Sequence, residues 1–234
     1  MFEYDDIGFV WGFFACLPVM WRMHQVGRLL LMPFRRLLVH LPEKKSSGEP
    51  VVLLDLGCGH GNFLALTKHV RPDLELIGLD LSPEKIVSAR HAFETSHCPV
   101  RELAVCDIAD FPKQSVDVIT ILDVLYLVPL ENWDHILGKC YECLKPGGRL
   151  LLKEMNRKVY WKFAVLCLEE TLAVKILHLT KGDKFTFPSP EEIHQRLERA
   201  GFSVREEPIH QGYTVPHFLW IGSKQPPASA AATA

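Results

Sequence analysis

Short apolar runs alternate with amphipathic stretches through most of the chain. Five of these runs have the length of a buried strand: 51–56, 74–79, 100–106, 116–122 and 149–155. Between them, apolar residues at helical spacing predict three helices: 62–70, 83–93 and 131–144. Strands that alternate with helices indicate a parallel sheet with helices on both faces.

The chain ends in a different pattern. A helix is predicted at 189–200, with Ser189 as its N-cap. Two strands follow, at 202–209 and 217–223, and the loop between them predicts a hairpin. We therefore expect an α/β fold: a doubly wound, mainly parallel seven-stranded sheet with an antiparallel C-terminal hairpin.

Two segments are additional to this alternation. Residues 1–45 join an uncharged run at 7–21 to a stretch rich in arginine and lysine, and residues 156–187 contain a long helical candidate. The uncharged run is too short to span a bilayer, and acids rather than cations precede it, which argues against a secretory signal. Two interpretations of 1–45 stay open: a helical lid, to which the insert at 156–187 also contributes, or a segment in a membrane interface. The main domain is then 46–224, and 225–234 is expected to be a disordered tail.

Charge and cysteine content restrict the function. Lys and Arg total 26 against 28 Asp and Glu, so the general basic surface of a nucleic-acid-binding protein is missing. Seven cysteines, an odd number, favour a reducing cytoplasm, and we expect a cytoplasmic protein. Cys140 and Cys143 lie in a predicted helix without a second pair, so we expect no metal site.

Three glycines, Gly57, Gly59 and Gly61, follow the first strand and precede a helix. Glycine lets the backbone turn tightly and approach a ligand, and the helix N-terminus presents free N–H groups. An ordinary strand-to-helix turn that binds no ligand can have the same glycine pattern, so this alternative stays open. A dinucleotide site would require glycine at position 62, where this chain has Asn62.

Acids end the next two strands. Asp80 follows Gly61 by 19 residues and suits the hydroxyls of a ribose. Asp107 could accept a hydrogen bond from an adenine amino group, while Ile108 covers the ring. Because the carboxyl ends of parallel strands share one edge, the three features predict a single ligand site there.

The motifs DLGCGHGNF, GLDLSPEKI, VCDIADFP and LKPGGRLLLKE together resemble the class I S-adenosylmethionine-dependent methyltransferases over about residues 51–223. The resemblance implies S-adenosylmethionine as cofactor and S-adenosylhomocysteine as product. It places the following residues at the cofactor: Asp55, Gly57, Cys58, Gly59, Gly61, Asp80, Leu81, Asp107, Ile108, Leu122 and Asp123.

Methyl transfer from a sulfonium is an in-line displacement, which mainly requires that acceptor and methyl are aligned and water is excluded. A base is needed only when the acceptor must lose a proton. Candidates for a catalytic role are Asp123, Tyr126 and His217, although the preferred interpretation of His217 is a capping or core role. Candidates for contact with the acceptor are Tyr126, Glu154, Trp161 and Tyr213.

The two added segments are aromatic and carry excess cations, which favours a small lipophilic or aromatic acceptor beneath them. Membrane-surface contact through residues 7–45 is compatible with this hypothesis. Two alternatives stay open: a methyltransferase of protein or carrier-bound substrates, and a non-catalytic, membrane-associated module that binds the cofactor. The oligomeric state cannot be read from the sequence.

Overall fold

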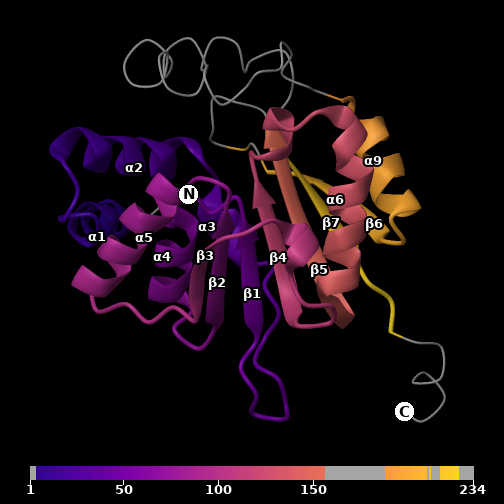
Figure 1. Ribbon diagram of the computed structural model, residues 1–234, viewed down its shortest axis with the longest axis horizontal. Coiled ribbons are helices and arrows are strands. Elements are labelled where there is room, and N and C mark those ends of the chain that lie inside the picture. The colour runs from indigo at the N-terminus through magenta and orange to yellow at the C-terminus, as the bar shows by residue number, and fades with distance from the viewer. Residues whose placement is uncertain (1–3, 156–187, 210, 212–216, 227–234) are drawn as a thin grey trace.

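The computed structural model describes residues 4–155, 188–209, 211 and 217–226. Its centre is a seven-stranded sheet of order β3-β2-β1-β4-β5-β7-β6 (Figure 1). The first five strands in this order pair in parallel, and β7 is antiparallel to both of its neighbours. The expected fold class, including the reversed C-terminal hairpin, is confirmed.

The strands correspond closely to the apolar runs of the sequence: β1 (Val52–Leu56), β2 (Glu75–Asp80), β3 (Glu102–Val105), β4 (Val116–Leu122), β5 (Leu144–Met155), β6 (Ser203–Pro208) and β7 (His217–Ser223). The helices between them are α4 (Asn62–Val70), α5 (Pro83–Thr95), α6 (Leu130–Cys143) and α9 (Pro190–Arg199). Short 3-10 turns η1 (Ile108–Asp110) and η2 (Leu125–Leu127) follow β3 and β4.

Local signals in the sequence set several of these boundaries. Ser82 and Ser189 cap α5 and α9, and their side chains accept hydrogen bonds from the amides of Lys85 and Glu192. β5 begins five residues earlier than the sequence predicts, because the turn around Gly147 is a bulge within the strand. Gly147 has a positive φ of 78°, which permits this bulge.

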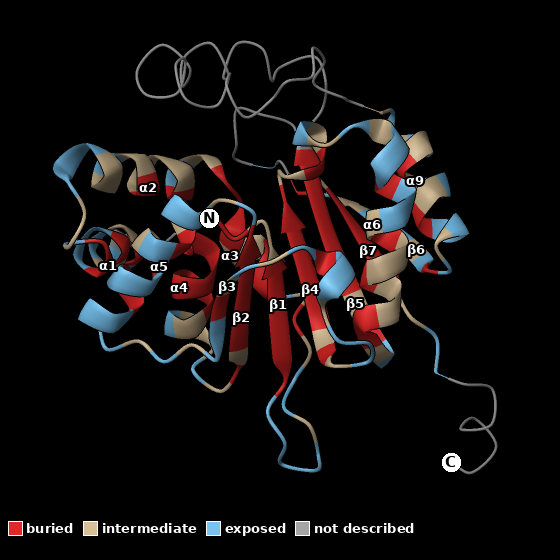
Figure 2. Cartoon of the chain, in the orientation of Figure 1, coloured by how far each residue is buried: buried red, intermediate tan, exposed pale blue. Residues whose placement is uncertain are grey.

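Alternate residues of each strand point to opposite faces, so the sheet supports two cores. Leu53 and Leu151 face the cluster beneath α4 and α5, whereas Leu54 and Leu152 face the cluster beneath α6 and α9. The central strands are buried along most of their length (Figure 2). This burial leaves the ends of the strands as the places where polar side chains can meet a ligand.

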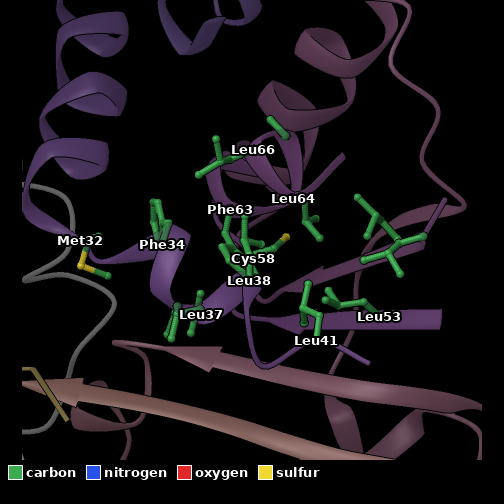
Figure 3. Packing of buried hydrophobic residues seen from close by; sticks show 14 of the residues in the cluster. Met32, Phe34, Leu37, Leu38, Leu41, Leu53, Cys58, Phe63, Leu64 and Leu66 are labelled. Carbon is green, nitrogen blue, oxygen red and sulfur yellow. The ribbon is translucent and has the colours of Figure 1, made fainter. Parts of the chain in front are cut away.

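Three helices precede the sheet: α1 (Tyr4–Phe13), α2 (Val19–Leu31) and α3 (Phe34–Leu38). Their apolar residues belong to the same core as α4, and Phe34 packs on Phe63 with ring centroids 5.5 Å apart (Figure 3). A buried ion pair fixes α1 to α3, since both Asp6 oxygens lie 2.7 Å from the Arg35 guanidinium. The N-terminal helices therefore pack on the same core as α4.

Several predicted features lie outside the described residues. They are the insert at 156–187 with Trp161, the loop residue Tyr213, and most of the predicted tail, 227–234. Within the described residues, no helix is both long and apolar enough to cross a membrane.

Candidate functional site

The loop between β1 and α4 is shaped by its glycines. Gly57, Gly59 and Gly61 have φ values of +76°, +57° and +81°, which side-chain-bearing residues rarely adopt. The amides of Gly57 and Cys58 donate to the Leu79 carbonyl oxygen at 2.7 and 3.0 Å, which folds the loop against the end of β2.

Two of the glycines differ in what surrounds them. A Cβ on Gly57 would lie 2.5 Å from the Val124 side chain, so the loop needs a bare backbone there. A Cβ on Gly59 would meet only the Arg28 Nη1, at 3.8 Å. The loop therefore packs closely against the segment after β4 and is open on the side of Arg28.

Asp80 joins the loop to the end of β2. One of its oxygens accepts a hydrogen bond from the Gly59 amide, and the other accepts one from the Ser82 amide, both at 2.8 Å. A carboxylate has about four acceptor positions, so two remain for a ligand. The neighbouring Leu81 is 71% exposed, which is unusual for leucine and suits an apolar contact with a bound ring.

Asp107 and Ile108 follow β3. Asp107 is exposed, and its Oδ1 accepts a hydrogen bond from the Ala109 amide at 2.9 Å, which caps η1. Ile108 is buried in the cluster beneath α6 and α9. The site thus presents the Asp107 carboxylate to solvent, and Ile108 lies within the core.

Charged side chains gather where β4 and β5 end. Asp123 has a positive φ of 54° and directly follows Leu122, which pairs with Lys153 across the sheet. Its Oδ2 forms an ion pair with the Lys153 ammonium, which is fully buried and also lies 3.3 Å from the Met32 sulfur. The other Asp123 oxygen is buried without a hydrogen-bond partner among the described residues.

Lys153 and Glu154 are neighbours on one strand and therefore point to opposite faces. Glu154 accepts a hydrogen bond from the Leu125 amide at 3.0 Å, which supports the η2 turn that carries the half-buried Tyr126. Burial, together with the nearby Asp123 carboxylate, raises the pKa of Glu154 to about 8. Burial also lowers the pKa of Lys153, against the opposing effect of Asp123.

Asp55 lies inside the sheet beneath the glycine loop. It is opposite Thr120 in the β1–β4 register, and the Thr120 hydroxyl donates to its Oδ1 at 2.6 Å. Burial raises the pKa of Asp55 to about 7, while this hydrogen bond and the Arg28 charge act in the other direction. The carboxyl group is thus balanced between its two protonation states near neutral pH.

His217 begins β7 and is almost fully buried. Its Nε2 lies 3.0 Å from the Leu31 carbonyl oxygen, which can only accept, so Nε2 carries a proton. The histidine therefore holds the C-terminal end of α2 onto the sheet.

The polar residues that α2 contributes to the site were not predicted from the sequence. The Asn62 side-chain amide at the start of α4 donates to the Gln25 backbone oxygen at 2.8 Å and to its side-chain oxygen at 3.2 Å. Arg28 follows Gln25 by one helical turn and faces the glycine loop. The detectable signal was the spacing of three between Gln25 and Arg28, which places both on one side of a helix that also carries Arg22 and His24.

These residues fit S-adenosylmethionine. Open backbone at Gly59 beside the Arg28 guanidinium suits an amino-acid carboxylate, and the unpartnered Asp123 oxygen suits an ammonium group. The Asp80 and Asp107 carboxylates, at the ends of β2 and β3, suit a ribose and an adenine. Among the described residues, no group of three or more His, Cys, Asp or Glu side chains is placed to hold a metal ion.

Comparison with known proteins agrees with this fit. Residues 24–207 match the model of a methyltransferase domain family. The chain is 28% identical to a demethylmenaquinone methyltransferase of Thermus thermophilus, over 79% of this chain and 87% of the relative. It is 31% identical to a ubiquinone biosynthesis O-methyltransferase of Nitrosococcus oceani, over 74% and 77% of the two chains.

Other similar proteins are named for different substrates or partners. A tRNA N(3)-methylcytidine methyltransferase of Drosophila melanogaster is 27% identical over 68% of this chain and 50% of its own length. Among solved structures, the methyltransferase in complex with the Trm112 activator of Haloferax volcanii has a TM-score of 0.65 at 19% identity, covering 88% of this chain and 95% of that one. With the family match and the geometry of the strand ends in agreement, the chain belongs to the class I S-adenosylmethionine-dependent methyltransferases.

Proposed function

We propose that this enzyme transfers the methyl group of S-adenosylmethionine to a small lipophilic or aromatic acceptor. The observation that carries the proposal is the apolar setting of the buried Asp123–Lys153 pair at the end of β4: the Met32 sulfur lies 3.3 Å from the Lys153 ammonium, and the buried Leu122 and half-buried Val124 flank Asp123 in the chain. When bound, the cofactor supplies an electrophilic methyl group on a sulfonium. A dry, apolar surrounding favours such a displacement, because it removes water that would compete with the acceptor.

The cofactor residues divide by the group that each would hold. The glycine loop, with Asp55, Cys58 and Arg28, would hold the methionine part, and Asp80 would hold the ribose. Asp107 would accept from the adenine amino group, with Leu81 against the ring and Ile108 beneath it. Leu122 and Asp123 would adjoin the reacting centre.

Of the three candidate catalytic residues, we favour Asp123. Its unpartnered oxygen is free to accept a hydrogen bond from the cofactor or a proton from the acceptor, whereas the Nε2 of His217 is engaged by Leu31. Tyr126 lies on η2, directly after the β4 exit, and is proposed to contact the acceptor. Trp161 and Tyr213 remain proposals for acceptor contact from outside the described residues, and Glu154 is proposed to act through η2.

Relatives support the acceptor class. Two of the proteins reported above are named for demethylmenaquinone and for ubiquinone biosynthesis, whose intermediates join an aromatic head to a lipophilic tail. RNA and protein acceptors are the competing classes, because one relative is named for tRNA and one structural neighbour was solved with Trm112. We also propose a cytoplasmic location with peripheral contact to the membrane.

The test uses S-adenosylmethionine with a radiolabelled methyl group and three acceptors in parallel: a prenylated hydroquinone, bulk tRNA and a whole-protein extract. We expect label only in the organic phase of the first reaction. Asp80→Asn serves as the reference, because it should weaken cofactor binding by calorimetry about tenfold or more. Label that enters tRNA or protein at the higher rate would overturn the proposed acceptor class.

A further inference from the structure

The inward side of α2 is mixed, because polar residues lie there together with the buried Leu29. At about 100° per residue, Trp21, Gln25 and Arg28 fall on one side of the helix. Gln25 is fully buried and Arg28 faces the glycine loop, so this side points inward. A surface helix normally turns its polar side to water.

The outward side of α2 is apolar. Val19, Met23 and Leu30 lie within about 40° of one another on the opposite face of the helix, and Met20 lies next to them. Their side chains are 59%, 63%, 38% and 56% exposed, in the order Val19, Met23, Leu30, Met20. Together with Trp11 of α1, we call these five residues the α2 face.

Exposed apolar side chains are concentrated on the α2 face and are not scattered evenly over the described surface. Ten large apolar side chains are exposed among the described residues, and five of them belong to this face. Scattered exposed apolar residues need no explanation, whereas a group on one helix marks a contact surface.

The edge of the face has the features of a membrane interface. The Arg22 guanidinium lies 4.0 Å from the centre of the Trp11 ring and donates to the Trp11 carbonyl oxygen at 2.9 Å. Arginine and tryptophan side chains of this kind sit at the boundary between headgroups and acyl chains. No acidic residue occurs from position 7 to position 42.

We propose that the α2 face binds the surface of a lipid bilayer, with its apolar side chains in the headgroup–acyl boundary and Arg22 at the phosphates. A second copy of the chain fits less well, because a stable protein interface takes about 20–30 residues from each partner. A helix that lies in a bilayer surface needs only one apolar side, and the missing acids suit an anionic headgroup layer.

The position of α2 connects this surface to the chemistry. The inner side of the helix covers the glycine loop, and its C-terminal end is held by His217 at the edge of the site. In Figure 1, α2 lies at the top of the molecule, the side toward which β4 runs. This step rests on the proposed function. If the acceptor is dissolved in the membrane, the arrangement would bring the site to within about one helix diameter of it.

The experiment measures co-sedimentation of the full chain with two kinds of vesicle: phosphatidylcholine alone, and phosphatidylcholine with phosphatidylglycerol. The variant is Met23→Asp, and the matched control is Val87→Asp on α5, where the side chain is also 63% exposed. We expect the unchanged chain to bind both vesicles, the anionic ones more tightly. Met23→Asp should weaken binding about tenfold, and Val87→Asp should leave it unchanged.

Two further measurements separate this inference from the proposed function. Calorimetry with S-adenosylmethionine should give the same affinity for both variants, because neither side chain faces the cofactor residues. Size-exclusion chromatography reports whether the face joins two copies instead. The inference is overturned if the unchanged chain does not sediment with vesicles, if both variants weaken sedimentation equally, or if Met23→Asp converts a dimer into a monomer.

Discussion

The Lys153 ammonium and the Asp123 carboxylate form an ion pair that is buried at the carboxyl ends of β5 and β4. Asp123 reaches this position from a left-handed backbone conformation, and its second oxygen has no partner among the described residues. A buried pair with one unsatisfied acceptor is expensive to maintain for stability alone. Its place beside the glycine loop is consistent with the function proposed above.

Removing one member of this pair should be costly. We expect Lys153→Met to lower the free energy of unfolding by about 3–5 kcal/mol, since it leaves the Asp123 charge buried and unpaired. The double variant Lys153→Met, Asp123→Asn should recover part of the loss, because it buries no unpaired charge. Urea unfolding of the unchanged chain, the double variant and each single variant measures these effects, and costs that simply add would contradict the coupling.

Asp55 should make stability depend on pH. The unfolded chain loses the Asp55 proton near the ordinary pKa of 3.8, whereas the folded chain keeps it up to about pH 7. Between these values the folded state binds more protons, so stability falls as pH rises from about 4 to 7.

The variant Asp55→Asn removes this titration and can still accept the Thr120 hydroxyl. The variant should therefore gain stability relative to the unchanged chain as pH rises, by at most about 1.4 kcal/mol per unit. Urea midpoints at pH 5 and pH 7 measure the change. The raised pKa of Glu154 gives a slope of the same sign in both chains and cancels in the difference. Parallel pH profiles would show that Asp55 is ionised in the fold at low pH.

Substitution of Gly57 and of Gly48 by alanine distinguishes the effect of a steric clash from the effect of backbone strain. Both have a φ near +78°, but a Cβ at Gly48 meets nothing within 4 Å, while one at Gly57 would strike Val124. Gly48→Ala should cost only the strain of about 1–2 kcal/mol. Gly57→Ala should cost more and should weaken cofactor binding at least tenfold, which thermal unfolding and calorimetry would measure. Equal effects of both changes would mean that the loop can move away from Val124.

Arg28 should hold the cofactor through its charge. Its side chain has no hydrogen-bond or ion-pair partner among the described residues, although it lies beside Gly59 and close to Asp55. We expect Arg28→Gln to weaken binding of S-adenosylmethionine about tenfold to hundredfold, the value of a lost charge-assisted contact. Arg22→Gln, one and a half turns earlier on the outer side, is the control and should bind normally. Unchanged affinity in Arg28→Gln would remove the assigned role.

The order of the strands and helices could be predicted from the chain because each signal is local. Ser82 and Ser189 cap helices through amides three residues away, and the glycine loop turns through its own φ angles. The positions of Asp80 and Asp107 at strand ends follow from the same local pattern, since parallel strands bring their carboxyl ends to one edge.

The roles of single side chains at the edge depended on longer-range contacts. His217 lies 186 positions from Leu31, and Lys153 lies 30 from Asp123 and 121 from Met32. No periodicity in the sequence reports which of these groups meet. For the same reason, only the structure shows that Glu154 accepts a hydrogen bond from the η2 turn and that Ile108 lies in the core.

The sequence by itself determined the α/β architecture and the glycine and acid positions that mark a cofactor site, because these depend on residue spacing within single elements. Only the tertiary structure decided that α2 turns Gln25 and Arg28 inward and leaves Val19, Met20, Met23 and Leu30 exposed. The direction of a helix face is set by what it packs against, and α2 packs against a loop that carries polar groups.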